Sequence, residues 1–198
     1  MTEINDIAES GRVPAAIGIP DLSMVVLVGA SGCGKSTFAR RFFRPTEILS
    51  SDFFRAMVAD DELDQSATPD AFEALHFVAR KRLRAGRLTV VDATNTQPMA
   101  RRPLVAIARE THVIPVAIVL NVPERVCRDR NARRADRQVP PHAIAMQSRQ
   151  LRDSLRALRR EGFRHVFILS DREIDDILAY LRWMRGHKVP LDSTGAAR

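Results

Sequence analysis

Residues 29–36, GASGCGKS, carry the strongest structural signal in this sequence. They fit the pattern GxxxxGK[ST], follow the apolar run Met24–Val28 and precede a helical pattern that opens at Ser36. Glycines let successive backbone N–H groups curl around a phosphate, and the N-terminus of the following helix adds positive potential. The segment therefore predicts a phosphate-binding loop between a strand and a helix.

The loop predicts a nucleoside triphosphate and a metal ion. We expect Lys35 to bridge the β- and γ-phosphates of ATP as a catalytic residue, and Ser36 to place its hydroxyl on Mg²⁺. Cys33 stands where a small residue is needed, either as a filler or as a redox-sensing thiol. The expected nucleotide-binding residues are Gly29, Ser31, Gly32, Cys33, Gly34, Lys35, Ser36 and Thr37.

Short apolar runs alternate with helical patterns along the rest of the chain, which indicates βαβ units. We therefore predict an α/β fold, a three-layer sandwich whose central parallel five-stranded sheet has helices on both faces and a helical, arginine-rich lid. The expected strands are Met24–Val28, Glu47–Leu49, Leu88–Val91, Val113–Leu120 and His165–Leu169. The expected helices are Ser36–Phe43, Pro69–Ala85, Ala100–Arg109, Pro123–Arg134, Pro141–Arg160 and Glu173–Met184.

The length of 198 residues suits one such domain. We expect it to span residues 17–185, with the lid at about 123–141, between loose ends at 1–16 and 186–198. Ser170 and Glu173 have the spacing of a capping box and predict the start of the last helix.

An aspartate follows the second expected strand, in the segment SSDFFR at residues 50–55. Parallel sheets place ligands at the carboxyl ends of their strands, so we expect Asp52 to face the terminal phosphate of ATP. There it can accept the proton of an attacking hydroxyl group, although it can also cap the helix that follows. Arg55, one helical turn later, is expected to point the same way and to hold an anionic group of the acceptor.

The third expected strand, Leu88–Val91, also ends in an acid, Asp92. We expect Asp92 to reach Mg²⁺ through water, or to position a neighbouring arginine, at the edge where substrates bind. A strand-terminal aspartate that caps a turn is the alternative.

Arginine is concentrated in one region. Residues 125–164 hold twelve arginines, no lysine and four acids, a net charge of +8, whereas the whole chain carries +7. A local basic field indicates polyanionic partners, either nucleotide phosphates or nucleic acid, unless these arginines only solvate a helix face. Arg130 and Arg137 are seven residues apart and would share one side of a helical lid, whereas solvation competes as the explanation for Arg133 and Arg134.

Five segments together resemble a known family. They are GASGCGKSTFARRFF, SSDFFR with the following DDELDQ, VVDATN, RNARRADRQVP and QLRDSLRALRREGFRHVFIL, in that order. They resemble the kinase module of bacterial polynucleotide kinase-phosphatase, an end-healing RNA repair enzyme, over roughly residues 18 to 170. The resemblance implies the fold of P-loop NTPase kinases.

The resemblance also implies an activity: transfer of the γ-phosphate of ATP, with Mg²⁺, to the 5′-OH of RNA or DNA. It implies Asp52 as the base, Arg55 on a phosphate of the acceptor, and Arg130 and Arg137 as catalytic lid residues on the donor phosphates. Cys33 replaces the usual serine of the loop. The family's phosphatase and ligase-like modules are absent from this sequence, so we expect either such partners acting in trans or a relative that uses another acceptor.

Two other classes of function remain open. One is a P-loop kinase of a small-molecule hydroxyl, such as a sugar, a nucleoside or a toxin substrate, and the other is an ATP-switched binding module. Arg55 and the basic lid favour the polynucleotide. Phe53 and Phe54 are candidates for stacking on a base, but both are equally plausible as core residues.

Several classes are excluded by what the sequence lacks. No apolar run approaches the roughly 18 to 20 residues that cross a bilayer, and the first residues do not form a secretory signal. Cys33 and Cys127 are far apart and predict neither a disulfide framework nor a zinc site. We expect a cytoplasmic protein with no membrane partner.

Overall fold

The computed structural model describes residues 18–135 and 138–174. Residues Ile19–Leu169 form the first and larger of two units. The expected loose ends at 1–16 and 186–198 lie outside the described residues. The architecture below is that of the first unit.

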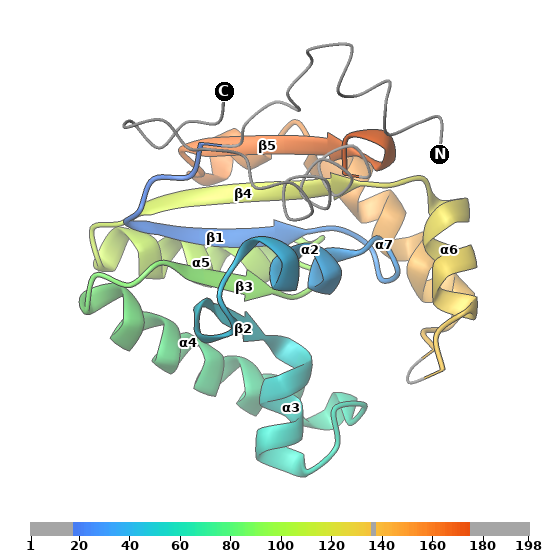
Figure 1. The fold of residues 1–198 in the computed structure, drawn as a ribbon, viewed down its shortest axis with the longest axis horizontal. Helices are drawn as coiled ribbons and strands as arrows, with labels where there is room; N and C mark the ends of the chain where they lie inside the picture. The colour runs from blue at the N-terminus through green and yellow to red at the C-terminus, as the bar shows by residue number, and fades with distance from the viewer. Residues whose placement is uncertain (1–17, 136–137, 175–198) are drawn as a thin grey trace, which may run out of the picture. The chain divides into compact units, whose positions relative to one another are not determined.

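A five-stranded sheet in the order β2-β3-β1-β4-β5 forms the centre of this unit, and its strands run parallel (Figure 1). The predicted fold class is therefore confirmed. Each strand lies within about a residue of its expected bounds at either end. The strands are β1 Ser23–Val28, β2 Ile48–Ser50, β3 Thr89–Asp92, β4 Ile114–Asn121 and β5 His165–Ser170.

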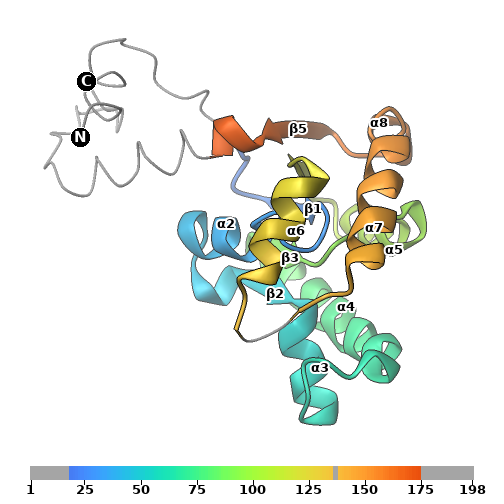
Figure 2. The ribbon, with the colours of Figure 1, turned by 90° about the vertical axis from the view of Figure 1, so that its right-hand side faces the viewer.

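Helices cover both faces of the sheet, as expected. Figure 2 shows α2 on one face and α4, α5 and α7 on the other. The helices are α2 Lys35–Phe42, α3 Ser51–Ala59, α4 Thr68–Arg84, α5 Pro98–Glu110, α6 Glu124–Ala132, α7 Pro141–Ser154 and α8 Leu158–Glu161, with short 3₁₀ turns η1 Pro45–Glu47 and η2 Gln65–Ala67.

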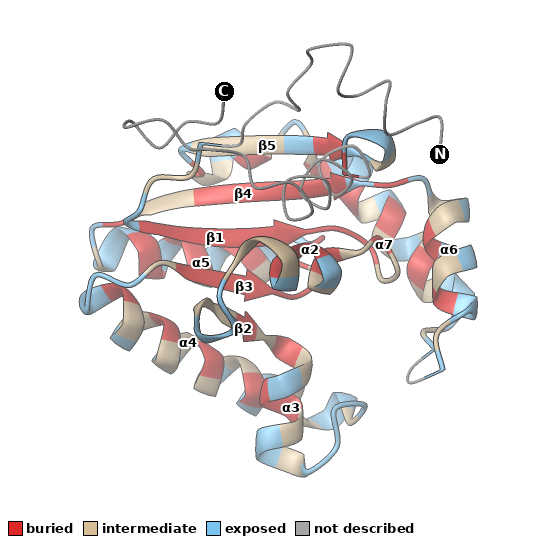
Figure 3. Ribbon diagram, viewed as in Figure 1, coloured by how far each residue is buried: buried red, intermediate tan, exposed pale blue. Residues whose placement is uncertain are grey.

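The core explains why the strands read as continuous apolar runs. Side chains alternate between the two faces of a strand, and every residue of β1 is buried (Figure 3). Met24, Val26 and Val28 belong to a cluster that also contains buried residues of α4, α5, α7 and α8. Val25 and Leu27 lie on the opposite side of the strand and are equally buried, so both faces of the strand are covered by packing.

The lid is less helical than predicted. The expected helix Pro123–Arg134 begins at Glu124 and ends at Ala132. The buried side chain of Asn131 explains where the chain turns, because its amide donates to the carbonyl oxygen of Val139 at 2.9 Å and accepts from the backbone N–H of Val139 at 3.0 Å. These two bonds clip the start of the lid loop to its end. Arg130 lies in α6, whereas Arg137 lies outside the described residues, so the shared side expected for these two arginines stays a prediction.

The long helix expected at Pro141–Arg160 is also interrupted. α7 ends at Ser154, and α8 starts at Leu158 after a turn. The hydroxyl of Ser154 donates to the carbonyl oxygen of Thr96 at 3.1 Å, which fixes the end of α7 against the loop after β3.

The predicted capping box is present. The backbone N–H and the hydroxyl of Ser170 donate to the Glu173 carboxylate at 2.7 and 2.6 Å, and residues 171–174 are helical. The rest of the expected helix Glu173–Met184, from residue 175 onwards, lies outside the described residues.

Candidate active site

The loop between β1 and α2 has a backbone that requires glycine. Gly32 has a φ of 81° and Gly34 a φ of 99°, both in the left-handed region that L side chains rarely adopt. A Cβ on Gly32 would lie 2.2 Å from the carbonyl oxygen of Cys127, in α6. The loop is therefore wedged against the first helix of the lid, and no side chain fits between them.

Lys35 is held at the mouth of this loop. Its Nζ donates to the carbonyl oxygens of Gly29 and Ala30, at 2.9 Å each, and the side chain is 8% exposed. None of the ion pairs in the described part of the chain involves Lys35. Its positive charge is therefore available to an anionic ligand that the loop binds.

Asp92 lies at the end of β3, and the sheet register places it beside Ser50 at the end of β2. The residue is 6% exposed, and this burial raises the pKa of its carboxyl group. A hydrogen bond from the hydroxyl of Ser36 and the charge of Lys35 oppose that rise. The carboxylate is thus directed at the phosphate-binding loop in surroundings that favour an added cation.

This pKa direction predicts that Asp92→Asn stabilises the ligand-free protein at neutral pH. At neutral pH an exposed carboxylate is ionised, and burial of Asp92 opposes that ionisation in the folded state, whereas asparagine carries no charge. The raised pKa means that the wild-type contribution to stability is present at acid pH and is lost as the pH rises through the pKa of the folded state. The melting temperature of the variant should therefore exceed that of wild type at pH 7, and the difference should vanish below about pH 4.

Asp153→Asn, on the exposed side of α7, is the matched control and should leave the melting temperature unchanged across this pH range. An Asp92→Asn protein that melts below wild type at pH 7, measured without ligand, would contradict the assigned sign.

Asp52 and Arg55 form an ion pair within α3. The Arg55 guanidinium is almost fully buried, and its Nε also donates to the carbonyl oxygen of Glu62 at 2.8 Å. Because Arg55 is fixed from both sides, the carboxylate of Asp52 is held in one orientation. The expectation that both side chains point the same way is met, with the additional finding that they contact each other.

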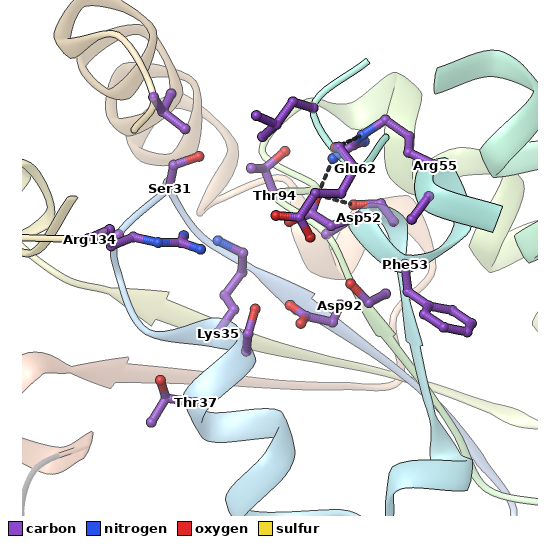
Figure 4. A pocket seen from close by; sticks show the side chains of 18 of the residues that line it. Ser31, Lys35, Thr37, Asp52, Phe53, Arg55, Glu62, Asp92, Thr94 and Arg134 are labelled. Atoms are coloured by element: carbon purple, nitrogen blue, oxygen red, sulfur yellow. Dashed lines mark hydrogen bonds and ion pairs between the residues drawn. The ribbon is translucent and has the colours of Figure 1, made fainter. Parts of the chain in front are cut away.

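These residues line one cleft of about 1300 Å³ (Figure 4). Among the predicted residues, Gly29 and Cys33 do not line it, since both lie behind the surface of the loop. The backbone N–H of Gly29 instead donates to the carbonyl oxygen of Thr94 at 2.9 Å, and Cys33 is buried. The predicted residues that line the cleft are Ser31, Gly32, Gly34, Lys35, Ser36, Thr37, Asp52, Arg55, Asp92 and Arg130.

The lid contributes Arg134 to the cleft in addition to the expected Arg130. Arg130 and Arg134 line the cleft, whereas Arg137 lies outside the described residues. Figure 4 shows the Arg134 side chain reaching from the lid towards Lys35. Arg133 is exposed, so the alternative of a solvated face applies to Arg133 and not to Arg134.

Of the two adjacent phenylalanines, only one is a core residue. Phe54 is buried in the main cluster, whereas Phe53 is 60% exposed and lines the cleft. Phe53 is therefore available for stacking on a ligand.

Two contacts at this site were not predicted. Gln147, on α7, accepts a hydrogen bond from the backbone N–H of Ser31 at 2.8 Å. Arg101, on α5, is fully buried and donates to both carboxylate oxygens of Glu161 and, at 2.7 Å, to the carbonyl oxygen of Asn95. A glutamine or an arginine on an amphipathic helix looks like a surface residue, so no sequence signal marks either contact.

The donor set fits a nucleotide with Mg²⁺. Mg²⁺ usually keeps several waters and takes one or two protein ligands together with phosphate oxygens, which matches one hydroxyl, Ser36, and one carboxylate, Asp92. No cluster of three or more metal-binding side chains occurs among the described residues, as a dedicated zinc or calcium site would need. The loop residues that line the cleft, among them Gly32, Gly34 and Lys35, would supply the phosphate cradle.

Fold and site together define a P-loop protein with a kinase-like core. The chain belongs to the AAA domain family, whose model matches residues 24–160. Membership implies that the chain binds a nucleoside triphosphate. No curated protein matches the sequence.

Solved structures show the same fold at low identity. A chain of the Pnkp1/Rnl/Hen1 RNA repair complex matches with a TM-score of 0.59 and 24% identity, over 71% of this chain and 46% of that one. A provisionally assigned kinase from Chloroflexus aurantiacus matches at 0.57 and 16%, over 85% and 99%. A sugar kinase from Janibacter sp. HTCC2649 matches at 0.54 and 21%, over 84% and 95%. The present chain thus spans less than half the length of the RNA repair protein.

In residues 18–135 and 138–174, the helices are too short or too polar to cross a membrane.

Proposed function

We propose that the chain is an ATP- and Mg²⁺-dependent polynucleotide 5′-hydroxyl kinase. The observation that carries the proposal is the Asp52–Arg55 pair, which lines the same cleft as Lys35. A carboxylate fixed by an arginine, opposite a triphosphate cradle, is the arrangement that phosphoryl transfer to an alcohol requires.

On the donor side, the loop backbone at Gly32 and Gly34 surrounds the β-phosphate and Lys35 contacts the β- and γ-phosphates. Ser36 and Asp92 would hold Mg²⁺, which when bound neutralises charge on the phosphates. Arg130 and Arg134 reach the cleft from the lid, where each guanidinium can contact two oxygens of the transferring group. We also propose that Arg137 contacts the phosphates of the donor.

On the acceptor side, Asp52 accepts the proton of the attacking hydroxyl group. A bond forms between the hydroxyl oxygen and the γ-phosphorus while the bond from that phosphorus to the β–γ bridging oxygen breaks, so the products are a 5′-phosphate and ADP. Arg55 uses Nε and one terminal nitrogen for Glu62 and Asp52. Its remaining N–H groups can bind a phosphate of the acceptor without releasing Asp52.

Three features support a polynucleotide acceptor over a small sugar. An arginine next to the base provides for an anionic acceptor, the net charge of +8 over residues 125–164 attracts a polyanion, and the exposed Phe53 offers a stacking surface. The resemblance to the RNA repair kinase module agrees with them. A role in end repair would require phosphatase and ligase partners that act in trans.

The test is an acceptor panel. The protein is incubated with γ-labelled ATP and Mg²⁺ and with 5′-OH RNA or DNA oligonucleotides, sugars, nucleosides or nucleoside 3′-phosphates. We expect label on the oligonucleotides. Nucleoside 3′-phosphates should be labelled about tenfold or more efficiently than nucleosides, because only the 3′-phosphate is an anion that Arg55 can bind. Transfer to oligonucleotides should fall steeply with added salt, as counterion release requires.

Label that appears only on sugars or nucleosides would overturn the polynucleotide proposal in favour of a small-molecule kinase. A salt response that is flat for oligonucleotides would contradict the electrostatic basis of acceptor binding.

A further inference from the structure

A second cavity, of about 260 Å³, opens beside the active-site cleft. Three residues, Phe72, Thr94 and Gln147, line both spaces, so the cavity is a side pocket of the cleft. We call it the amide pocket. Its complete lining is Phe72, Thr94, Asn95, Thr96, Gln97, Ala100, Met146, Gln147 and Gln150.

The position of the amide pocket relates it to the acceptor. Thr94 follows Asp92 by two residues, and its carbonyl oxygen accepts from the backbone N–H of Gly29 at 2.9 Å. The pocket therefore begins at the tip of β3, next to the loop that binds the phosphates. Asp52 follows the end of β2, the strand that pairs with β3 and places Ser50 beside Asp92. When the hydroxyl group of an acceptor lies between the loop and Asp52, the rest of the acceptor molecule can extend into the amide pocket.

The lining selects a neutral ligand. Four side chains end in carboxamides and none is charged, so neither a phosphate nor an ammonium group finds a counter-ion there. The side chains of Phe72 and Met146 add apolar surface. The volume lies below the roughly 300 Å³ at which pockets for drug-sized molecules begin, so it suits one ring system rather than a whole nucleotide.

Asn95 supplies an acceptor that the protein does not use. The residue is 1% exposed, and its Nδ2 donates to the carbonyl oxygen of Leu27 at 2.9 Å. Its Oδ1 is buried and has no hydrogen-bond partner in the described part of the chain. Arg101 holds the backbone of Asn95 through its carbonyl oxygen, and the bonds of Nδ2 to the carbonyl oxygens of Leu27 and Ala93 orient the side chain. Because Asn95 also lines the amide pocket, we infer that a donor on a bound ligand is the partner of this acceptor.

Gln147 supplies the complementary donor. The backbone N–H of Ser31 must donate, so the atom of Gln147 that it contacts is the oxygen, Oε1. The amide nitrogen of Gln147 therefore remains for the other side, where this residue lines the pocket. The pocket thus offers an acceptor and a donor between apolar walls.

We propose that the amide pocket binds the nucleobase of the acceptor's 5′-terminal nucleotide through its Watson–Crick edge; this rests on the proposed kinase function. Each of the four bases carries a hydrogen-bond donor next to an acceptor on that edge. The pocket should therefore accept any base, and it should favour a terminal nucleotide that has a base over an abasic one. Because the edge must be free, the terminal nucleotide must be unpaired.

The test combines an altered substrate with an altered pocket. Wild-type protein should phosphorylate a single-stranded oligonucleotide about tenfold more efficiently, in kcat/KM, than the same oligonucleotide with an abasic 5′-terminal nucleotide. Ala100→Phe should fill the pocket and reduce this ratio to about one, with the KM for ATP unchanged. Met99→Phe, the adjacent position, is 81% exposed and does not line the pocket, so it should keep the wild-type ratio.

Wild-type protein that uses abasic and ordinary ends equally well would overturn the pocket assignment and leave the kinase proposal intact. The same conclusion follows if Ala100→Phe keeps the tenfold ratio with an unchanged melting temperature. Absence of transfer to every oligonucleotide would overturn the kinase proposal, and the pocket assignment with it.

Discussion

Asp52→Asn is expected to reduce phosphoryl transfer by about 10²- to 10⁴-fold, the range for loss of a general base. Asparagine keeps an oxygen that can accept from Arg55, so the change removes the basicity of the side chain and retains its contact. ATP affinity should stay within about twofold of wild type, because the loop and Lys35 are untouched. The measurements are kcat with a 5′-OH oligonucleotide and nucleotide binding by titration.

Asp60→Asn is the matched control for this variant. Asp60 ends the same helix, α3, in a left-handed conformation that asparagine also adopts, and it is exposed. It should have wild-type activity. If Asp52→Asn keeps more than a tenth of the wild-type kcat, Asp52 is not the base; if biological output survives while transfer is lost, the chain acts as an ATP-switched binding module.

Lys35→Met should weaken both nucleotide binding and transfer. Methionine retains an unbranched apolar stem but removes the ammonium group that bonds the loop carbonyls and that would contact the β- and γ-phosphates. Loss of one positioned donor to a transition-state oxygen costs about 10²- to 10³-fold in kcat. We expect that loss together with at least about a tenfold increase in the dissociation constant for ATP.

Lys81→Met, on the exposed side of α4, removes the same charge away from the cleft and should change neither quantity. A Lys35→Met protein that binds ATP as wild type does would show that the loop amides alone hold the triphosphate.

The strands of the sheet were predictable from sequence because a strand that is buried on both faces is apolar at nearly every position. This pattern can be recognised without knowing which elements the strand packs against. Met24–Val28 is apolar throughout, and the glycine pattern after it has one known structural context. Asp52 and Asp92 could be placed for the same reason: a residue that follows a parallel strand lies at the ligand-binding edge, whatever the sheet order.

Contacts between distant helices could not be predicted. The bond between Gln147 and the backbone of Ser31 joins residues 116 positions apart, and the Arg101–Glu161 pair joins residues 60 apart. Their periodicity is that of ordinary amphipathic helices, so only the packed structure brings them together. The prediction of the lid helix was wrong at its end for a different reason. Helical spacing predicts a continuous helix, but it cannot show that Asn131 forms a hydrogen bond with a backbone group eight residues later.

The two hydrogen bonds between Asn131 and Val139 affect which sequence changes the lid can accept. The loop between Asn131 and Val139 is anchored at its ends, so a change in its length or charge alters only a short closed segment. For flexible loops the entropic cost of closure rises only slowly with loop length. If the lid contacts the phosphates of ATP as proposed, insertions or substitutions at residues 133–138 should alter these contacts while the sheet stays as it is.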